Sequence, residues 1–294
     1  MNNNPIICTS SHLRTTKATA KIAEDIAKAL EQLGIEHIEL QNTNDYWCRD
    51  YMPVRLFEDG TYSRYTYHPD YLWDYKPKHL YITEQSDACK CLSLFTPTDM
   101  DVIFDGGNYV RCNGKVIMTD KIFMENPQWK AEELLHHLHH VLCAEVVIIP
   151  WDMSDPYGHS DGIVAPLDDG RLLLNNYVQN KRSKAFYKRL HKILDAHFDV
   201  IDLSFDCKLD LDSWCYINFL NLPNALLLPA LSENFDCDND KEASRVMERL
   251  FPNKQIIPIY AKPLIKNGGA LHCITWEYVP QEHPLRQSLL GLQR

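Results

Sequence analysis

Residues 104–123 read FDGGNYVRCNGKVIMTDKIF, and this stretch decides the fold. An apolar segment leads to the pair Asn113-Gly114, a second apolar segment follows, and the stretch ends in polar residues. Asn-Gly between two apolar runs is a strong signal for a tight β-hairpin. The stretch therefore predicts two antiparallel strands joined by a short turn.

The same pattern recurs twice further along the chain, at residues 159–178 (HSDGIVAPLDDGRLLLNNYV) and 215–234 (CYINFLNLPNALLLPALSEN). A stretch with apolar residues at three- and four-residue spacing follows each hairpin and predicts an amphipathic helix. These helical stretches begin at Pro127, Lys184 and Asp240. A β-rich run then follows in each case (EVVIIP, FDVIDL and QIIPIY), so each unit is expected to fold as ββαβ.

Five such units account for the chain. Corresponding points lie about 55 residues apart, a period typical of repeat architectures, at Asp50, Gly106, Gly162, Tyr216 and Gly269. A first helix is expected from Thr16 to a C-terminal glycine at Gly34. The last unit, GALHCITWEYVP, is expected to be a hairpin whose helix and outer strand come from the N-terminus, which closes a ring. The prediction is an α/β fold, a five-bladed ββαβ propeller with pseudo-fivefold symmetry, forming one catalytic domain over residues 1–294.

Composition limits the classes of partner. The formal net charge is −10, which argues against a nucleic-acid partner. No apolar run approaches the roughly 18 residues of a membrane span, and no signal peptide is recognised. The ten cysteines are scattered without a CxxC pair. A reduced, cytoplasmic protein is expected, without a membrane partner, while self-association into a homo-oligomer is left open.

Chemistry-bearing residues fall at matching points of the repeat. Cys273 follows His272 at the end of a β-like run and is preceded by Gly268 and Gly269. A thiol approached by glycine backbone is how a nucleophile can be presented to a buried substrate. His159 is the candidate acid and base, because imidazole titrates near neutral pH.

The carboxylates of Asp50 and Asp161 fall at matching points of the repeat, so they are expected beside that histidine. Two carboxylates facing one site repel each other unless a cation lies between them. A planar guanidinium suits that place, because its N–H donors match carboxylates in a fork. The site is therefore expected to take a small cationic guanidine.

Together these motifs resemble the guanidine-modifying superfamily, in particular its agmatine deiminase and peptidylarginine deiminase branch, whose fold is the five-unit α/β propeller (pentein). The matching pieces are NDYWCRDYMPV, DVIFDGGNYV, the Asn-Pro of MENPQWK, SDPYGHSDG and NGGALHCITW. The resemblance implies that Cys273 attacks the guanidinium carbon, that Asp50 and Asp161 hold its nitrogens, and that His159 protonates the departing ammonia and then activates water. No metal or other cofactor is implied.

The resemblance also implies a set of residues around the substrate. Trp47 and Asp155 would form the pocket wall, with Asp155 in place of a glutamate common in agmatine deiminases. Gly268 and Gly269 would let backbone approach the flat guanidinium. Asp105 is expected to orient neighbours or contact substrate, and Asn108 is a further substrate-binding candidate.

Agmatine, giving N-carbamoylputrescine and ammonia on a route to putrescine, is the favoured substrate. Peptidylarginine or free arginine is the alternative, followed by an amidinotransferase and a non-catalytic guanidine-binding protein. The aromatic stretch at residues 62–78 is either a substrate lid or a surface flap, inserted into the first unit.

Overall fold

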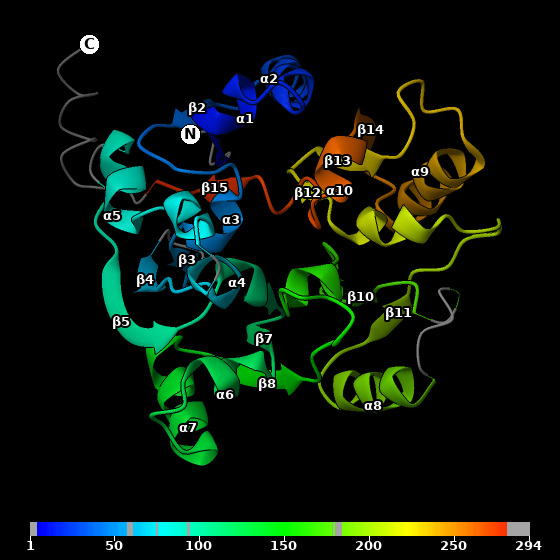
Figure 1. Cartoon of the computed structure of the whole chain (residues 1–294). Helices are drawn as coiled ribbons and strands as arrows, with labels where there is room; N and C mark the ends of the chain where they lie inside the picture. The colour runs from blue at the N-terminus through cyan, green and yellow to red at the C-terminus, as the bar shows by residue number, and fades with distance from the viewer. Residues whose placement is uncertain are drawn as a thin grey trace, which may run out of the picture.

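Five small three-stranded sheets follow one another around a ring in the computed structural model of the chain (Figure 1). The structure describes residues 5–57, 61–74, 76–92, 95–177, 179 and 184–280. Within each sheet the first strand pairs antiparallel with the middle strand, and the middle strand pairs parallel with the outer one. The predicted ββαβ unit is thus confirmed, and the fold is the five-bladed α/β propeller.

The strands group into five blades in chain order. The bounds are, for the first blade, β15 (Trp276–Tyr278), β1 (Ile6–Ser10) and β2 (His37–Leu40); for the second, β3 (Val54–Arg55), β4 (Tyr62–Thr66) and β5 (Thr98–Ile103); for the third, β6 (Val110–Cys112), β7 (Lys115–Thr119) and β8 (Glu145–Ile149); for the fourth, β9 (Val164–Pro166), β10 (Leu172–Leu174) and β11 (Val200–Asp202); and for the fifth, β12 (Leu220–Asn221), β13 (Ala225–Ala230) and β14 (Gln255–Tyr260).

The first strands of all five blades meet at the centre of the ring. One cavity of about 230 Å³ is lined by residues from each of them, namely Val54, Val110, Val164, Asn221 and Trp276. The longer helices lie outside, where Figure 1 shows α2, α7, α8 and α9 around the rim. Chain segments just before the first strands therefore converge on one axis, as the repeat predicts.

The helices are α1 (Ser11–Thr15), α2 (Ala20–Gln32), α3 (Cys48–Tyr51), α4 (Asp70–Trp73), α5 (Gln85–Ala88), α6 (Lys121–Glu125), α7 (Ala131–Val141), α8 (Lys184–Asp195), α9 (Asp238–Leu250) and α10 (Lys262–Ile265). None of the helices within the described ranges is both long and apolar enough to cross a membrane. Gly34 follows α2 with a φ of +65°, the left-handed geometry expected of a C-terminal glycine.

Four local expectations are corrected. The last unit supplies only β15, because its middle strand is the N-terminal β1. Cys273 lies in a turn three residues before β15 rather than at a strand end. The helix expected from Pro127 begins at Ala131, and the one expected from Thr16 begins at Ala20 as α2, after the separate short helix α1 that ends at Thr15.

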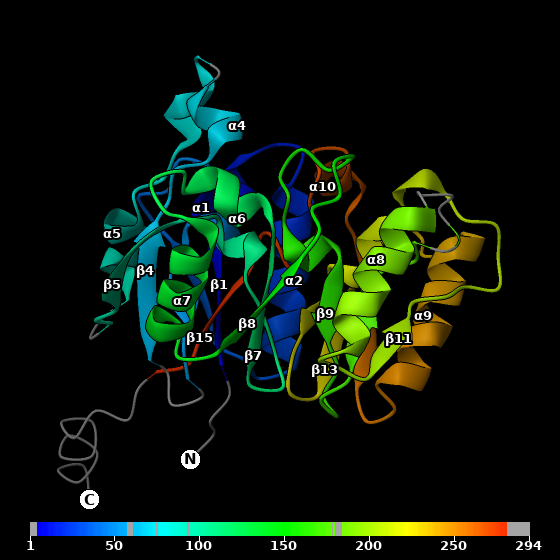
Figure 2. The ribbon, with the colours of Figure 1, turned by 90° about the horizontal axis from the view of Figure 1, so that it is seen from below.

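The aromatic stretch at residues 62–78 is also more regular than expected. Its first five residues form β4, the middle strand of a blade, and Asp70–Trp73 forms the short helix α4. Tyr75 lies outside the described residues. Only the part after β4 is an insertion, and Figure 2 shows α4 projecting from the body of the ring.

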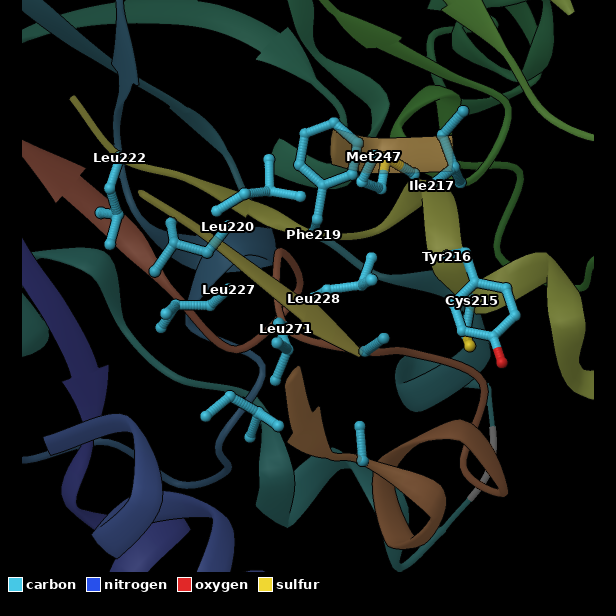
Figure 3. Close-up of a cluster of buried hydrophobic side chains, with 14 of the residues drawn as sticks. Cys215, Tyr216, Ile217, Phe219, Leu220, Leu222, Leu227, Leu228, Met247 and Leu271 are labelled. Atoms are coloured by element: carbon cyan, nitrogen blue, oxygen red, sulfur yellow. The ribbon is translucent and has the colours of Figure 1, made fainter. Parts of the chain in front are cut away.

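Apolar packing fixes the turn that carries Cys273. Leu271 and Ile274 on either side of it are fully buried in a cluster with the strands of the fifth blade, such as Leu227 on β13 (Figure 3). Burying a leucine side chain contributes roughly 1.5–3 kcal/mol. The nucleophile candidate therefore lies on a backbone anchored by the core of the neighbouring blade.

An aspartate in the first turn of α9 supports the fold. Asp240 is 2% exposed. Its carboxylate accepts hydrogen bonds from the backbone N–H groups of Leu231 and Ser232 at 2.7 and 2.9 Å and from the hydroxyl of Tyr216 at 2.8 Å. These bonds tie α9 to the end of β13.

Replacing Asp240 with alanine should lower the free energy of unfolding by about 3 kcal/mol, because it leaves buried donors without an acceptor. Urea denaturation followed by circular dichroism measures this change. The exposed Asp236, four residues earlier, is the matched control, and Asp236→Ala should leave the midpoint nearly unchanged. Equal effects of the two substitutions would contradict the role of Asp240 in tying α9 to the end of β13.

Candidate active site

A short helix or turn precedes the first strand of each blade and carries the polar residues of the axis. These turns are α3, the 3₁₀ turns at Gly106–Asn108, Ser160–Gly162 and Leu211–Ile217, and the turn at residues 271–274. Because they are equivalent by the fivefold repeat, their side chains meet although they are distant in sequence. The residues brought together are Asp50, Asp105, His159, Asp161, Asn218 and Cys273.

His159 lies between two buried carboxylates. Its Nε2 is 3.2 Å from Asp105 Oδ2, and its Nδ1 is 3.6 Å from Asp50 Oδ1. Gly107 makes this arrangement possible, because a Cβ there would lie 2.4 Å from His159 Nδ1 and 2.9 Å from Asp50 Oδ1. Both ring nitrogens thus face acceptors, which favours the doubly protonated imidazolium.

Cys273 lies against the third carboxylate. Its Sγ is 3.8 Å from Asp161 Oδ2, the same oxygen that accepts a 2.6 Å hydrogen bond from His272 Nδ1. Asn218 also holds the turn in place, because its Oδ1 accepts hydrogen bonds from the backbone N–H groups of Ala270 at 3.1 Å and Cys273 at 3.3 Å. The sulfur is therefore fixed beside a carboxylate.

The charges of the site are set by burial and mutual contact. Burial alone would lower the pKa of His159, but the carboxylates of Asp50 and Asp105 outweigh it and raise that pKa to about 10. Burial raises the pKa of Asp50 to about 8, against the opposing effect of His159. Burial would also raise the pKa of Asp161, but hydrogen bonding by His272 holds it below its usual range.

Without a ligand, the thiol of Cys273 is protonated. Burial raises its pKa well above the usual range, and the carboxylates of Asp161 and Asp50 raise it further. Asp50 Oδ1 and Asp105 Oδ1 are buried without a hydrogen-bond partner among the described residues. Buried acceptors are rarely left unpaired, so these two oxygens are suited to accept hydrogen bonds from a cationic ligand.

A cavity of about 480 Å³ reaches three of these groups, His159, Asp161 and Cys273, and Asp155 and Gly268 also line it. Asp50 and Asp105 are not among its lining residues. Further residues around it are Asp152, Tyr157, Tyr177, Trp214, Lys266 and Asn267. The volume suits a small extended molecule.

Asp155 shapes the loop before His159. Its carboxylate accepts the backbone N–H groups of Tyr157 at 3.1 Å, Gly158 at 2.9 Å and His159 at 3.3 Å. The residue lines the cavity as expected of a wall residue. Its carboxylate also fixes the backbone that presents the histidine.

Four residues expected to contact substrate have other close neighbours. A Cβ at Gly269 would lie 2.3 Å from Trp47 Cζ3, and one at Gly268 would lie 2.5 Å from Tyr157 Cε2, so the glycine pair makes room for aromatic rings, while Gly268 also lines the cavity. Trp47 packs behind Gly269 and is absent from the cavity lining. Asn108 is also absent from it, and its Oδ1 accepts the backbone N–H of Thr119 at 2.7 Å.

Several residues near the site were not predicted from the sequence patterns. Asn218 falls in the CYIN segment, at the phase of the repeat that supplies the other axial residues, and this signal could have identified it. His272 adjoins the nucleophile candidate. Tyr71 and Lys121 have no periodic signal, because they reach the site from α4 and α6.

Comparison with known proteins places the chain in a family. The model of the Porphyromonas-type peptidyl-arginine deiminase family matches residues 6–279. An agmatine deiminase of Stutzerimonas stutzeri is 24% identical over 290 residues, covering 84% of this chain and 77% of that protein.

Solved structures show the same fold. A C. jejuni agmatine deiminase superposes with a TM-score of 0.72 at 15% identity, covering 95% of this chain and 94% of that one. An agmatine deiminase of Enterococcus faecalis gives a TM-score of 0.70 at 17% identity, covering 95% and 94%. With the family match spanning all five blades, the chain belongs to the Porphyromonas-type peptidyl-arginine deiminase family and is a hydrolase that acts on C–N bonds of linear amidines.

Proposed function

We propose that the protein deiminates agmatine through a covalent intermediate on Cys273, giving N-carbamoylputrescine and ammonia. One observation carries the proposal: three buried carboxylates surround His159 and Cys273, and Asp50 Oδ1 has no hydrogen-bond partner among the described residues. A guanidinium supplies donors and positive charge to this arrangement at once.

The guanidinium is expected to lie between Asp50 and Asp161. The described contacts of Asp161 fall on Oδ2, so Oδ1 remains for a substrate nitrogen. The positive charge of the bound substrate lowers the pKa of the nearby Cys273 thiol, which then becomes the thiolate nucleophile. The substrate therefore activates the group that attacks it.

The reaction proceeds in two displacements. Cys273 Sγ bonds to the guanidinium carbon, a C–N bond breaks, and His159 transfers a proton to the departing ammonia. His159 then accepts a proton from water as that water attacks the S-alkylthiouronium carbon, and the C–S bond breaks to give the ureido product and the thiol. Asp105 and Asp50 keep the imidazole oriented through both steps.

The lining of the cavity favours agmatine over arginine. Asp152, Asp155 and Asp161 contribute three carboxylates, against the single ammonium of Lys266. A tail that ends in an ammonium is attracted by this balance, whereas the α-carboxylate of free arginine is repelled. The relatives named above as agmatine deiminases support the same choice.

The test is ammonia release from agmatine, arginine and an arginyl peptide, with product masses measured in the presence and absence of an amine acceptor. Agmatine should give the highest kcat/KM. If none of the three releases ammonia, the deiminase proposal is wrong. Transfer of the amidino group to the acceptor would identify an amidinotransferase, and tight agmatine binding without an adduct on Cys273 would identify a binding protein.

The pH dependence follows from the two shifted groups. The free protein must hold Asp50 as a carboxylate and His159 as imidazolium, so kcat/KM should rise as pH increases through about 8 and fall through about 10. The profile of Asp50→Asn should lack the limb near pH 8, and its falling limb should move to a pH below 10, because the carboxylate of Asp50 is one of the contacts that raise the pKa of His159. A wild-type profile that is flat from pH 7 to 9 would contradict this assignment.

A further inference from the structure

Lys121 is a buried cation next to the site that the proposed reaction does not use. It is 1% exposed at the start of α6. A buried ammonium is costly unless it is paired. Its Nζ lies 2.9 Å from Glu125, 3.1 Å from Asp70 and 3.6 Å from Asp105.

The backbone before His159 makes room for the lysine. Gly158 has a φ of +70°, and a Cβ there would lie 2.7 Å from Lys121 Cδ and 3.0 Å from Trp151 Nε1. The carbonyl of Gly158 accepts a 2.6 Å hydrogen bond from Thr119 Oγ1 at the end of β7. The aliphatic part of the Lys121 side chain therefore packs against Gly158, the residue that precedes the candidate acid and base His159.

Lys121 is connected to His159 through Asp105. Asp105 Oδ2 lies 3.6 Å from Lys121 Nζ and 3.2 Å from His159 Nε2. The same oxygen thus faces an ammonium on one side and the imidazole on the other. The ammonium holds Asp105 in the position from which it orients the imidazole.

Lys121 is also connected, through Asp70, to the projecting helix α4. Asp70, whose side chain is 52% exposed, pairs with the buried lysine, and the next residue, Tyr71, covers the site. Tyr71 Oη lies 3.5 Å from Asp50 Oδ2, and its ring lies 4.9 Å from that of Tyr157. Lys121 Nζ lies 5.5 Å from the centre of the Tyr71 ring, a cation–π distance.

We propose that Lys121 is a positioning residue for the deimination reaction: it holds Asp105 against His159 and, through Asp70, holds Tyr71 over Asp50. The inference rests on the proposed function. It gives helix α4, in the inserted segment after β4, the role of a roof over the guanidine end of the substrate, held by the ion pair between half-exposed Asp70 and buried Lys121.

The test uses the charge-balanced double variant Lys121→Met with Glu125→Gln. Methionine keeps an apolar side chain beside Gly158. The second change removes the buried carboxylate of Glu125, which would otherwise lose its partner cation and whose pKa burial already raises to about 8. Folding is checked by the thermal midpoint. With Asp105 released, kcat for ammonia release should fall about 10²-fold, the size of a general acid–base contribution, with KM changed less.

A second readout does not need turnover. The titration of His159, followed by NMR of ¹³C-labelled histidine, should move to lower pH in the double variant, because Asp105 is one of the contacts that raise the pKa of His159. The double variant keeps the other ionisable groups that face this histidine, which are Asp50, Asp161, Tyr71 and Tyr157. It removes Glu125, whose charge also acts on His159, so the shift is measured against Glu125→Gln alone. In Lys121→Arg, which keeps the charge, the titration of His159 should stay close to that of the wild type.

Asp70→Asn tests the roof separately. Loss of the ion pair frees α4, so KM for agmatine should rise several-fold while kcat falls less. A double variant with wild-type kcat and an unmoved His159 titration would overturn the positioning role. A wild-type protein that releases no ammonia would instead overturn the proposed function, and the NMR comparison would still decide the role of Lys121.

Discussion

Cys273→Ser is expected to lower kcat for ammonia release from agmatine by about 10⁴-fold or more, on the scale of removing a covalent nucleophile. Serine is nearly isosteric and keeps the backbone bond to Asn218, so the turn should stay in place. Its hydroxyl is far harder to ionise than a thiol, even beside a bound cation. Turnover should therefore be lost while the fold and the substrate affinity are kept.

Mass spectrometry of protein quenched during turnover gives the direct measurement. The wild type should carry an adduct with the mass of the amidino intermediate on the peptide that contains Cys273, and the serine variant should carry none. Cys91→Ser, at an exposed cysteine, is the matched control and should retain full activity. A serine variant that keeps a tenth of the wild-type rate would rule out covalent catalysis by this sulfur.

The repeat was predictable because its signals are local. Asn113 and Gly114 both adopt positive φ, +49° and +77°, as the tight hairpin turn requires. The amphipathic spacing from Lys184 likewise predicts α8, which begins at that residue. Once two blades have the same order of elements, the phase of the remaining blades follows, and the convergence of Asp50, His159, Asp161 and Cys273 follows from the phase.

Element boundaries were less predictable, because side chains from other blades set them. Asn126 accepts the N–H of Ile103 at 2.9 Å and donates to the carbonyls of Ile103 at 2.6 Å and Ile122 at 2.9 Å. It is therefore committed to β5 and α6, and α7 starts only at Ala131. No periodic pattern reports such a contact.

The sequence motifs also mark paired glycines without saying which side chains lie opposite them. The pair Gly268-Gly269 was interpreted as space for substrate, and its neighbours are the rings of Tyr157 and Trp47. Which ring faces a glycine depends on how two blades pack, because the contacting residues are more than 100 positions apart in the first case and more than 200 in the second. The roles of Tyr71 and Lys121 could not be predicted from the sequence for the same reason.

Asp161→Asn is expected to change two rates in opposite directions. Asp161 is proposed to hold a guanidinium nitrogen, so loss of its charge should lower kcat/KM for agmatine about 10³-fold, as for removal of a charge-stabilising group in an active site. The same carboxylate raises the pKa of the Cys273 thiol in the free protein. Its neutralisation should lower that pKa and make Cys273 react faster with iodoacetamide at pH 7.

Both rates are measured on the same protein, with thermal midpoints to check that the amide still accepts the bond from His272. Asp168→Asn is the control, because Asp168 is exposed and pairs with Lys254 at the surface, 2.9 Å away. It should change neither rate. If turnover and alkylation fall together in Asp161→Asn, the substitution has disturbed the turn. If alkylation quickens while turnover slows, Asp161 acts through its charge, opposing the thiolate until the cationic substrate arrives.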